Sequence, residues 1–142
     1  ALLADIGRYI ILYKYGGMYH DLRFMSNINE NNLNYNSTFV AEICPNDPYR
    51  VRNGNILLLQ TKHPSLDNIL QRIKSKLILT KIENWKGSRN MFKIGSGTYI
   101  KYCNENPILV SRDRFNFEES GLIYSGLERW QDVEDNIFTN SI

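Results

Sequence analysis

The sequence predicts one α/β domain, because helical and strand-like patterns alternate along its 142 residues. Three segments carry this prediction: an amphipathic helix over residues 2–15, a continuous apolar strand over 56–60, and a second amphipathic helix that begins at residue 63. Apolar side chains make up 42% and charged side chains 23% of the chain, which is typical of a globular protein. Residues 1–142 show no internal repeat and no linker, and we expect them to form a single domain.

The first helix is predicted from apolar residues that recur three and four positions apart. We expect one face of it to be buried, formed by Leu2, Leu3, Ile6, Tyr9, Ile10 and Tyr13. Asp5, Arg8 and Leu12 share a different face. Because the helical pattern starts at Ala1 without a capping segment, we expect the chain to be truncated at its N-terminus.

A strand is expected directly after this helix. Gly16-Gly17 supplies the left-handed turn that commonly ends a helix. Residues 18–24 then alternate as a strand does, which places Tyr19, Asp21 and Arg23 on one face. The polar edge of the helix and this polar face of the strand are therefore expected to be neighbours.

The middle of the chain is expected to supply the centre of the sheet. Residues 26–38 are rich in asparagine and show no period, so they predict a loop, and 39–43 predict a short strand. The prolines in 45–48 predict irregular chain, and the Asn-Gly-Asn sequence at 53–55 predicts a turn. The apolar run over 56–60 is continuous, which favours a strand buried on both faces.

The second half begins with the clearest helix. Its first turn contains Pro64, and its expected buried stripe consists of Leu66, Ile69, Leu70, Ile73 and Leu77. Residues 81–93 give no clear pattern. Gly95-Ser96-Gly97 is expected to open a short helix that ends near Cys103, and 108–110 predict a late strand. Beyond them, only 128–134 have a weak helical pattern.

Charge and composition exclude several classes of function. The 17 Lys and Arg against 15 Asp and Glu give a net charge of +2 without a basic cluster that would hold nucleic acid, so no nucleic-acid partner is expected. The longest apolar stretch, residues 9–13, is too short to span a bilayer, so no membrane segment is expected in this chain. Cys44 and Cys103 are too few for a disulfide framework or a structural zinc site, and we expect buried thiols.

The helix and the following strand concentrate polar groups beside a very apolar sequence. Arg8 and Arg23 carry donors for phosphate oxygens, and Asp5 and Asp21 can accept from hydroxyl groups or hold a metal ion. The simpler interpretation is a surface ion pair between Asp5 and Arg8. The residues alone leave both interpretations open.

Residues 4–24, ADIGRYIILYKYGGMYHDLRF, closely resemble the DxD sugar-binding region of glycosyltransferases. The relatives include mannosyltransferases, among them the inositol-phosphoceramide enzymes, and the glucosylating clostridial toxins. Weaker similarity continues through the Asn-Gly-led strand, His63-Pro64 and Ile94-Gly95-Ser96-Gly97. The resemblance implies a GT-A fold, with a mixed, mostly parallel sheet flanked by helices, from which the N-terminal nucleotide-binding portion is missing.

The resemblance also implies roles for individual residues. Asp5 and Arg8 would contact hydroxyl groups of the donor sugar, Tyr19 would lie by the nucleotide, and Asp21 would contact the ribose or the metal ion. Asn53 would hydrogen-bond a sugar, although an Asn-Gly turn is the commoner role for it. Further donor-site residues are expected at the predicted helix start, where a plain tight turn is the alternative: Gly95, Ser96 and Gly97.

The sequence departs from the family pattern at Arg23, where the second Asp of the DxD motif would bind a divalent cation, Mn²⁺ or Mg²⁺. A guanidinium donates no electron pair to a cation and repels it, so metal binding is in doubt here. Either Arg23 replaces the cation by pairing with the donor diphosphate, with Asp21 and Arg23 as the catalytic residues, or the motif has lost its activity.

Two functions therefore follow from the resemblance. The first is transfer of a hexose from a nucleotide sugar, UDP- or GDP-linked, to a hydroxyl acceptor on a glycan, a lipid or a protein. The alternative is a catalytically inactive glycosyltransferase-like module that binds a glycan or a protein partner. The compartment is left open: the Golgi lumen for a chain with an upstream anchor, the cytoplasm otherwise.

Overall fold

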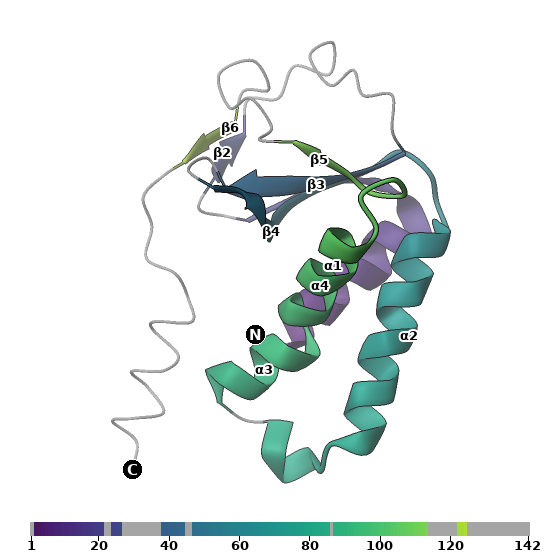
Figure 1. Ribbon diagram of the computed structural model, residues 1–142, viewed down its shortest axis with the longest axis vertical. Helices are drawn as coiled ribbons and strands as arrows, with labels where there is room; N and C mark the ends of the chain where they lie inside the picture. The colour runs from purple at the N-terminus through teal and green to yellow at the C-terminus, as the bar shows by residue number, and fades with distance from the viewer. Residues whose placement is uncertain are drawn as a thin grey trace.

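The described chain begins with a helix, continues with a run of strands, and then forms a run of helices before two short C-terminal strands (Figure 1). The computed structural model describes residues 2–21, 24–26, 38–44, 47–85, 87–113 and 122–124. In chain order the elements are α1 (Leu2–Tyr15), β1 (Gly17–His20), β2 (Phe24–Ser26), β3 (Phe39–Cys44), β4 (Asp47–Leu58), α2 (Pro64–Leu79), the 3-10 helix η2 (Ile82–Trp85), α3 (Ser88–Ile94), α4 (Ser96–Glu105), β5 (Ser111–Asp113) and β6 (Leu122–Tyr124).

The larger sheet has the strand order β1-β4-β3-β5, and β2 pairs with β6 in a separate sheet. The strand β4 runs antiparallel to β1 and to β3, whereas β3 and β5 are parallel. The mixed α/β class is confirmed, but the expected mostly parallel sheet is wrong for the described strands. The reason is the short connection between β3 and β4, because a parallel pair needs a crossover of a dozen or more residues.

The helix α1 spans 2–15 as predicted, but its buried face differs from the expected one. Leu2, Asp5, Arg8, Tyr9 and Leu12 are buried, whereas Leu3 and Ile10 of the expected stripe are exposed. The sequence analysis placed Asp5 and Arg8 on a different face from the apolar stripe. In the structure these charges satisfy one another, so their face can be buried.

The central strand β4 is longer than predicted. It begins at Asp47 and continues through 53–55, where a turn was expected. The pairing of β3 with β4 instead shifts between Ala41 and Glu42, whose partners are Ile56 and Arg52, so residues 53–55 form a bulge opposite β3. The predicted burial of the apolar run is confirmed for 56–58.

The helices pack on one side of the larger sheet (Figure 1). Leu66, Ile69 and Ile73 of α2 are buried, as its pattern predicts. Tyr9 of α1 stacks on Tyr99 of α4, with ring centroids 5.2 Å apart, and this pair joins the two helices in the core. Apolar burial of this kind is the main stabilising contribution to the fold.

Three local predictions are corrected by the structure. The strand expected over 18–24 ends at His20, and 24–26 belong to β2 in the other sheet. The strand expected over 108–110 begins instead at Ser111, because Pro107 starts a turn. Of the loop expected over 26–38, Ser26 belongs instead to β2, and 27–37 lie outside the described residues, as does the weak helical pattern over 128–134. No described helix is long and apolar enough to cross a membrane.

Candidate functional site

The guanidinium of Arg8 lies between two carboxylates. Its Nη2 is 3.1 Å from Oδ1 of Asp5, one turn earlier on α1, and its Nη1 is 3.4 Å from Oδ1 of Asp21, just beyond β1. The side chains of Arg8 and Asp5 are 4% and 7% exposed, whereas that of Asp21 is 16% exposed. Asp21 is therefore the member of this triad that lies nearest to solvent.

The remaining contacts of Arg8 also fix its position. Its Nη1 donates to the carbonyl oxygen of Asn53 at 2.8 Å, and its Nε donates to the carbonyl oxygen of Ala4 at 3.4 Å. The guanidinium carbon lies 4.3 Å from the centroid of the Tyr19 ring, in a cation–π contact. The Tyr19 hydroxyl donates to Oδ1 of Asp21 at 2.9 Å. The planar guanidinium thus organises both carboxylates and the tyrosine.

Asn53 reaches this group from β4. Its Nδ2 donates to Oδ1 of Asp5 and lies equally close to the hydroxyl of Tyr9, each at 3.0 Å. The bulge over 53–55 places it there, and the same bulge lets the Gly54 carbonyl accept from the backbone N–H of Asp21 at 2.8 Å. We call Asp5, Arg8, Tyr19, Asp21 and Asn53 the Arg8 network; the first four lie within a stretch that the sequence singled out.

The residues of the predicted glycine-rich helix start have different surroundings. A Cβ atom on Gly95 would lie 3.1 Å from Oδ2 of Asp5, so this residue borders the Arg8 network. A Cβ atom on Gly97 would lie 2.6 Å from the carbonyl oxygen of Phe92, which explains the glycine by packing against α3. The Ser96 hydroxyl is buried and has no hydrogen-bond partner among the described residues.

Burial controls the electrostatics of the Arg8 network. Desolvation raises the pKa of Asp5, although Arg8 and the hydrogen bond from Asn53 act in the opposite direction. Desolvation likewise raises the pKa of Tyr19 to about 12, against the effect of the neighbouring guanidinium. The Tyr19 hydroxyl therefore keeps its proton at neutral pH and donates a hydrogen bond to Asp21.

One buried acid beside the network was missed from the sequence. Glu42 on β3 is fully buried, and Nδ2 of Asn55 in the bulge donates to its Oε2 at 2.8 Å. Burial raises its pKa, and Asp21 contributes in the same direction. A signal was present: Glu42 is the one charged residue in the otherwise apolar strand 39–43. A charge in such a strand needs a buried polar partner.

The family resemblance implies a divalent cation, so the donor set was compared with what such an ion needs. Hard cations take several oxygen ligands and prefer carboxylates. The described residues offer Asp5 and Asp21, and both already pair with the Arg8 guanidinium. No group of three His, Cys, Asp or Glu that suits a metal ion is found in the described part of the chain. These residues alone do not fit a resident divalent cation.

Several candidate residues from the sequence lie outside the Arg8 network or outside the described residues. Arg23, expected to be catalytic, lies outside the described residues. His63 caps α2: its Nδ1 accepts from the backbone N–H of Ser65 at 3.1 Å. Cys103 is buried, as expected.

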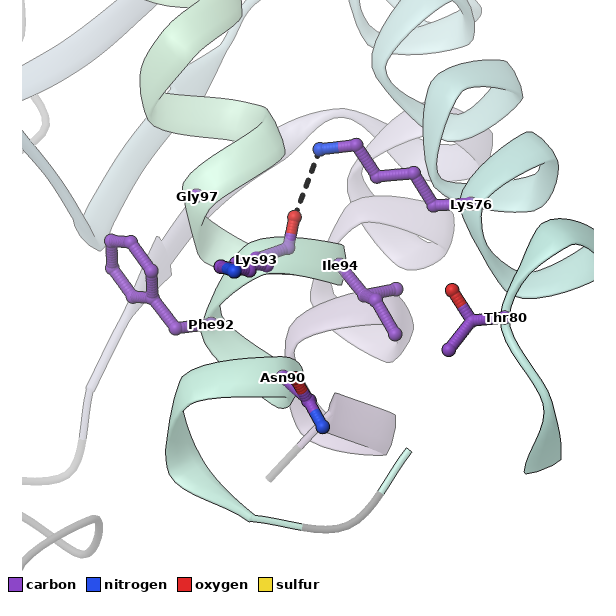
Figure 2. A pocket seen from close by; sticks show the side chains of 7 residues that line it. All are labelled: Lys76, Thr80, Asn90, Phe92, Lys93, Ile94 and Gly97. Atoms are coloured by element: carbon purple, nitrogen blue, oxygen red, sulfur yellow. Dashed lines mark hydrogen bonds between the residues drawn. The ribbon is translucent and has the colours of Figure 1, made fainter. Parts of the chain in front are cut away.

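Two cavities formed by described residues lie among the helices, away from the Arg8 network. One, of about 430 Å³, is bordered by the end of α2, by α3 and by the start of α4, and Lys76, which lines it, donates a hydrogen bond to the Lys93 carbonyl oxygen (Figure 2). The other, of about 540 Å³, lies between α2 and α4. Gly97 lines the first, but no member of the network lines either cavity.

Residues 1–40 match the family described as the glycosyltransferase sugar-binding region containing a DXD motif. The matched stretch contains α1, β1 and β2, and with them four of the five members of the Arg8 network. Asn53 lies beyond it. No curated protein and no solved structure gives a match. The match thus covers the first part of the chain and supports a glycosyltransferase-like sequence without specifying a subfamily.

Proposed function

We propose that this chain is the sugar-binding part of a GT-A-like glycosyltransferase that moves a hexose from a nucleotide sugar to a hydroxyl acceptor. The observation that carries the proposal is the Arg8 network, in which Asp5, Arg8 and Asp21 of the matched stretch form one connected group. A surface ion pair, the simpler interpretation of these residues, does not describe side chains that are this deeply buried.

Within the network the buried and the accessible members take different roles. All the contacts described for Arg8 are internal, so it acts as a positioning residue that orients the two carboxylates. Asp21 lies nearer to solvent, and Tyr19 fixes one of its oxygens by hydrogen bonding. Asp21 is thus placed to accept a hydrogen bond from a ribose or hexose hydroxyl group of the donor.

Arg23 completes the proposed mechanism. It is two residues beyond Asp21, where a DxD motif has its second Asp. When the glycosidic bond of the donor breaks, negative charge accumulates on the departing nucleoside diphosphate, and a guanidinium stabilises this charge by paired hydrogen bonds. No step of this mechanism passes through a metal ion.

The alternative function, a module that binds a glycan or a partner protein without catalysis, is favoured by one specific observation. All the described hydrogen bonds and ion pairs of Arg8 are to other groups of the protein, so the network needs no ligand to satisfy it. A group of this kind persists as a structural element after catalysis is lost. The two proposals share the fold and differ in whether the chain responds to a nucleotide sugar.

Calorimetric titration of the full chain with UDP-glucose and GDP-mannose tests the proposal, together with an assay for donor hydrolysis. We expect one of the donors to bind and Asp21→Asn to weaken binding about tenfold or more, since it loses a charge-assisted hydrogen bond. The matched control is Asp47→Asn, an exposed carboxylate on β4. Binding that both variants weaken equally would contradict the site, and a chain that ignores nucleotide sugars would favour the non-catalytic module.

Metal dependence tests the role of Arg23 separately. With Arg23 in place of the cation, a chelator leaves turnover unchanged. Arg23→Asp restores the DxD pattern and is expected to make turnover depend on added Mn²⁺. Loss of wild-type turnover on chelation would show that the guanidinium does not replace the cation.

A further inference from the structure

Three large aliphatic side chains are exposed together where α2 ends. Ile78 is 73%, Leu79 85% and Ile82 74% exposed. The end of α2 and the adjoining η2 form the extremity of the helical layer that lies farthest from the larger sheet (Figure 1). We call these three residues the tip. Single exposed aliphatic residues are common on protein surfaces, whereas here three fall within five positions of the chain.

The tip is held in place by the protein beneath it. The backbone N–H of Thr80 donates to the carbonyl oxygen of Lys76 at 3.0 Å, which ends α2. The indole Nε1 of Trp85 donates back to the carbonyl oxygen of Thr80, also at 3.0 Å. These two bonds hold the chain on both sides of Thr80. The exposed aliphatic groups are therefore presented on an ordered turn, which lowers the entropic cost of binding.

Charge around the tip indicates what it contacts. Six of the 17 Lys and Arg of the chain lie between Lys74 and Lys93, and Glu83 is the one acid in that stretch. Elsewhere in the sequence acids outnumber bases. Lys74 and Lys81, each within four positions of a tip residue, are exposed. An exposed apolar end with flanking positive charge is complementary to a surface that is anionic outside and apolar within.

We propose that the tip docks on a lipid bilayer that contains anionic phospholipids. Ile78, Leu79 and Ile82 enter the boundary between headgroups and acyl chains, while Lys74 and Lys81 contact lipid phosphates. This proposal does not depend on the proposed glycosyl transfer. A bilayer fits better than a second copy of the chain, because two such tips, each with flanking positive charge, repel each other.

Other exposed aliphatic residues lack this combination. Leu3, Ile10 and Ile11 on the outer face of α1 are exposed, but no comparable group of basic residues accompanies them. Ile108, in the turn before β5, is 95% exposed. It is as apolar and as accessible as the tip residues and lies outside the basic stretch. Ile108 therefore provides a matched control for the experiment.

Co-sedimentation of the full chain with vesicles tests the proposal. One set of vesicles contains phosphatidylcholine alone, and the other contains phosphatidylcholine mixed with phosphatidylserine. We expect binding to the mixed vesicles, weakened by added salt because the attraction is partly electrostatic. Leu79→Glu is expected to reduce the partition coefficient about tenfold, since it removes an inserted apolar side chain and adds a negative charge. Ile108→Glu makes the same chemical change and is expected to leave binding within about twofold of that of the wild type.

Three results would overturn the proposal. The first is a wild-type chain that does not sediment with the mixed vesicles. The second is an Ile108→Glu variant that loses as much binding as Leu79→Glu. The third is self-association, measured by light scattering, that Leu79→Glu abolishes while vesicle binding is unchanged, because the tip would then be a contact between copies. Both substituted residues are exposed, so circular dichroism is expected to show an unchanged fold for each variant.

Discussion

Gly95 and Asp5 are so close that a Cβ atom on the glycine would lie 3.1 Å from the carboxylate Oδ2 and 3.2 Å from the Asp5 Cβ. Gly95 directly precedes α4, so the carboxylate lies beside the N-terminus of that helix. The exposed N–H groups at a helix N-terminus stabilise a negative charge there. This contact connects the glycine-rich helix start to the Arg8 network, although the two are 90 residues apart in sequence.

Gly95→Ala tests whether this close approach is required. The added methyl group has to displace Asp5 or Leu2, and we expect a loss of about 1 kcal/mol in the free energy of unfolding, measured by urea denaturation. Gly7→Ala is the matched control, because a Cβ atom on Gly7 meets nothing within 4 Å in the middle of α1. It is expected to raise stability by about 0.5–1 kcal/mol through helix propensity. Equal effects at the two positions would contradict the packing argument.

The sequence predicted the helices well because their signals are local. The start of α2 follows from Pro64 and the cap before it, and α1 has the predicted bounds. The buried face of α1 was predicted wrongly, because the partners that allow Arg8 to be buried are distant: Asp21 is 13 and Asn53 is 45 positions away. A pattern within one helix contains no information about such partners.

The candidate site shows the same division. The sequence singled out Asp5, Arg8, Tyr19 and Asp21 from one continuous stretch, and the structure places them in contact. Asn53 was also a candidate, but the segment 53–55 that carries it was predicted to be a turn and is part of β4. An Asn-Gly pair indicates local backbone irregularity, but whether the chain turns or bulges depends on which strands pair beside it, and that is a tertiary property.

His63 is expected to make stability depend on pH. Its Nδ1 accepts from Ser65, and its Nε2 lies 3.0 Å from the Thr38 hydroxyl, so the neutral ring suits the site. Burial lowers its pKa below the ordinary 6.5. The unfolded chain then binds the proton more readily, and stability falls as the pH drops below 6.5 toward the folded pKa. His63→Asn keeps a capping acceptor without this titration, and urea denaturation should show a flatter pH dependence for it. An unchanged pH dependence would exclude His63 as its source.

Glu42 is expected to produce a pH dependence of the opposite sign. Its Oε1 and Oδ1 of Asn55 are buried without hydrogen-bond partners among the described residues, an arrangement that favours the protonated acid. The folded pKa is raised above the ordinary 4.5, so the folded state keeps the proton longer and stability falls as the pH rises from 4.5 toward the folded pKa. Glu42→Gln should therefore be more stable than the wild type at pH 7, by about 1 kcal/mol, and similar near pH 4. Glu105→Gln, at an exposed ion pair with Arg72, is the control and should show no such gain.

Arg8→Lys separates the positioning role of the guanidinium from its charge. Lysine keeps the charge but has a single amino group, which cannot reach Asp5, Asp21 and the Asn53 carbonyl together. At least one buried acceptor then loses its donor, and we expect a loss of about 2 kcal/mol or more in the free energy of unfolding. Arg72→Lys changes the same chemical group where the side chain is 40% exposed and pairs with Glu105 at 3.2 Å, so it should cost only about 0.5 kcal/mol. If the two variants lost equal stability in urea denaturation, the buried network would be no more than a surface ion pair in energetic terms.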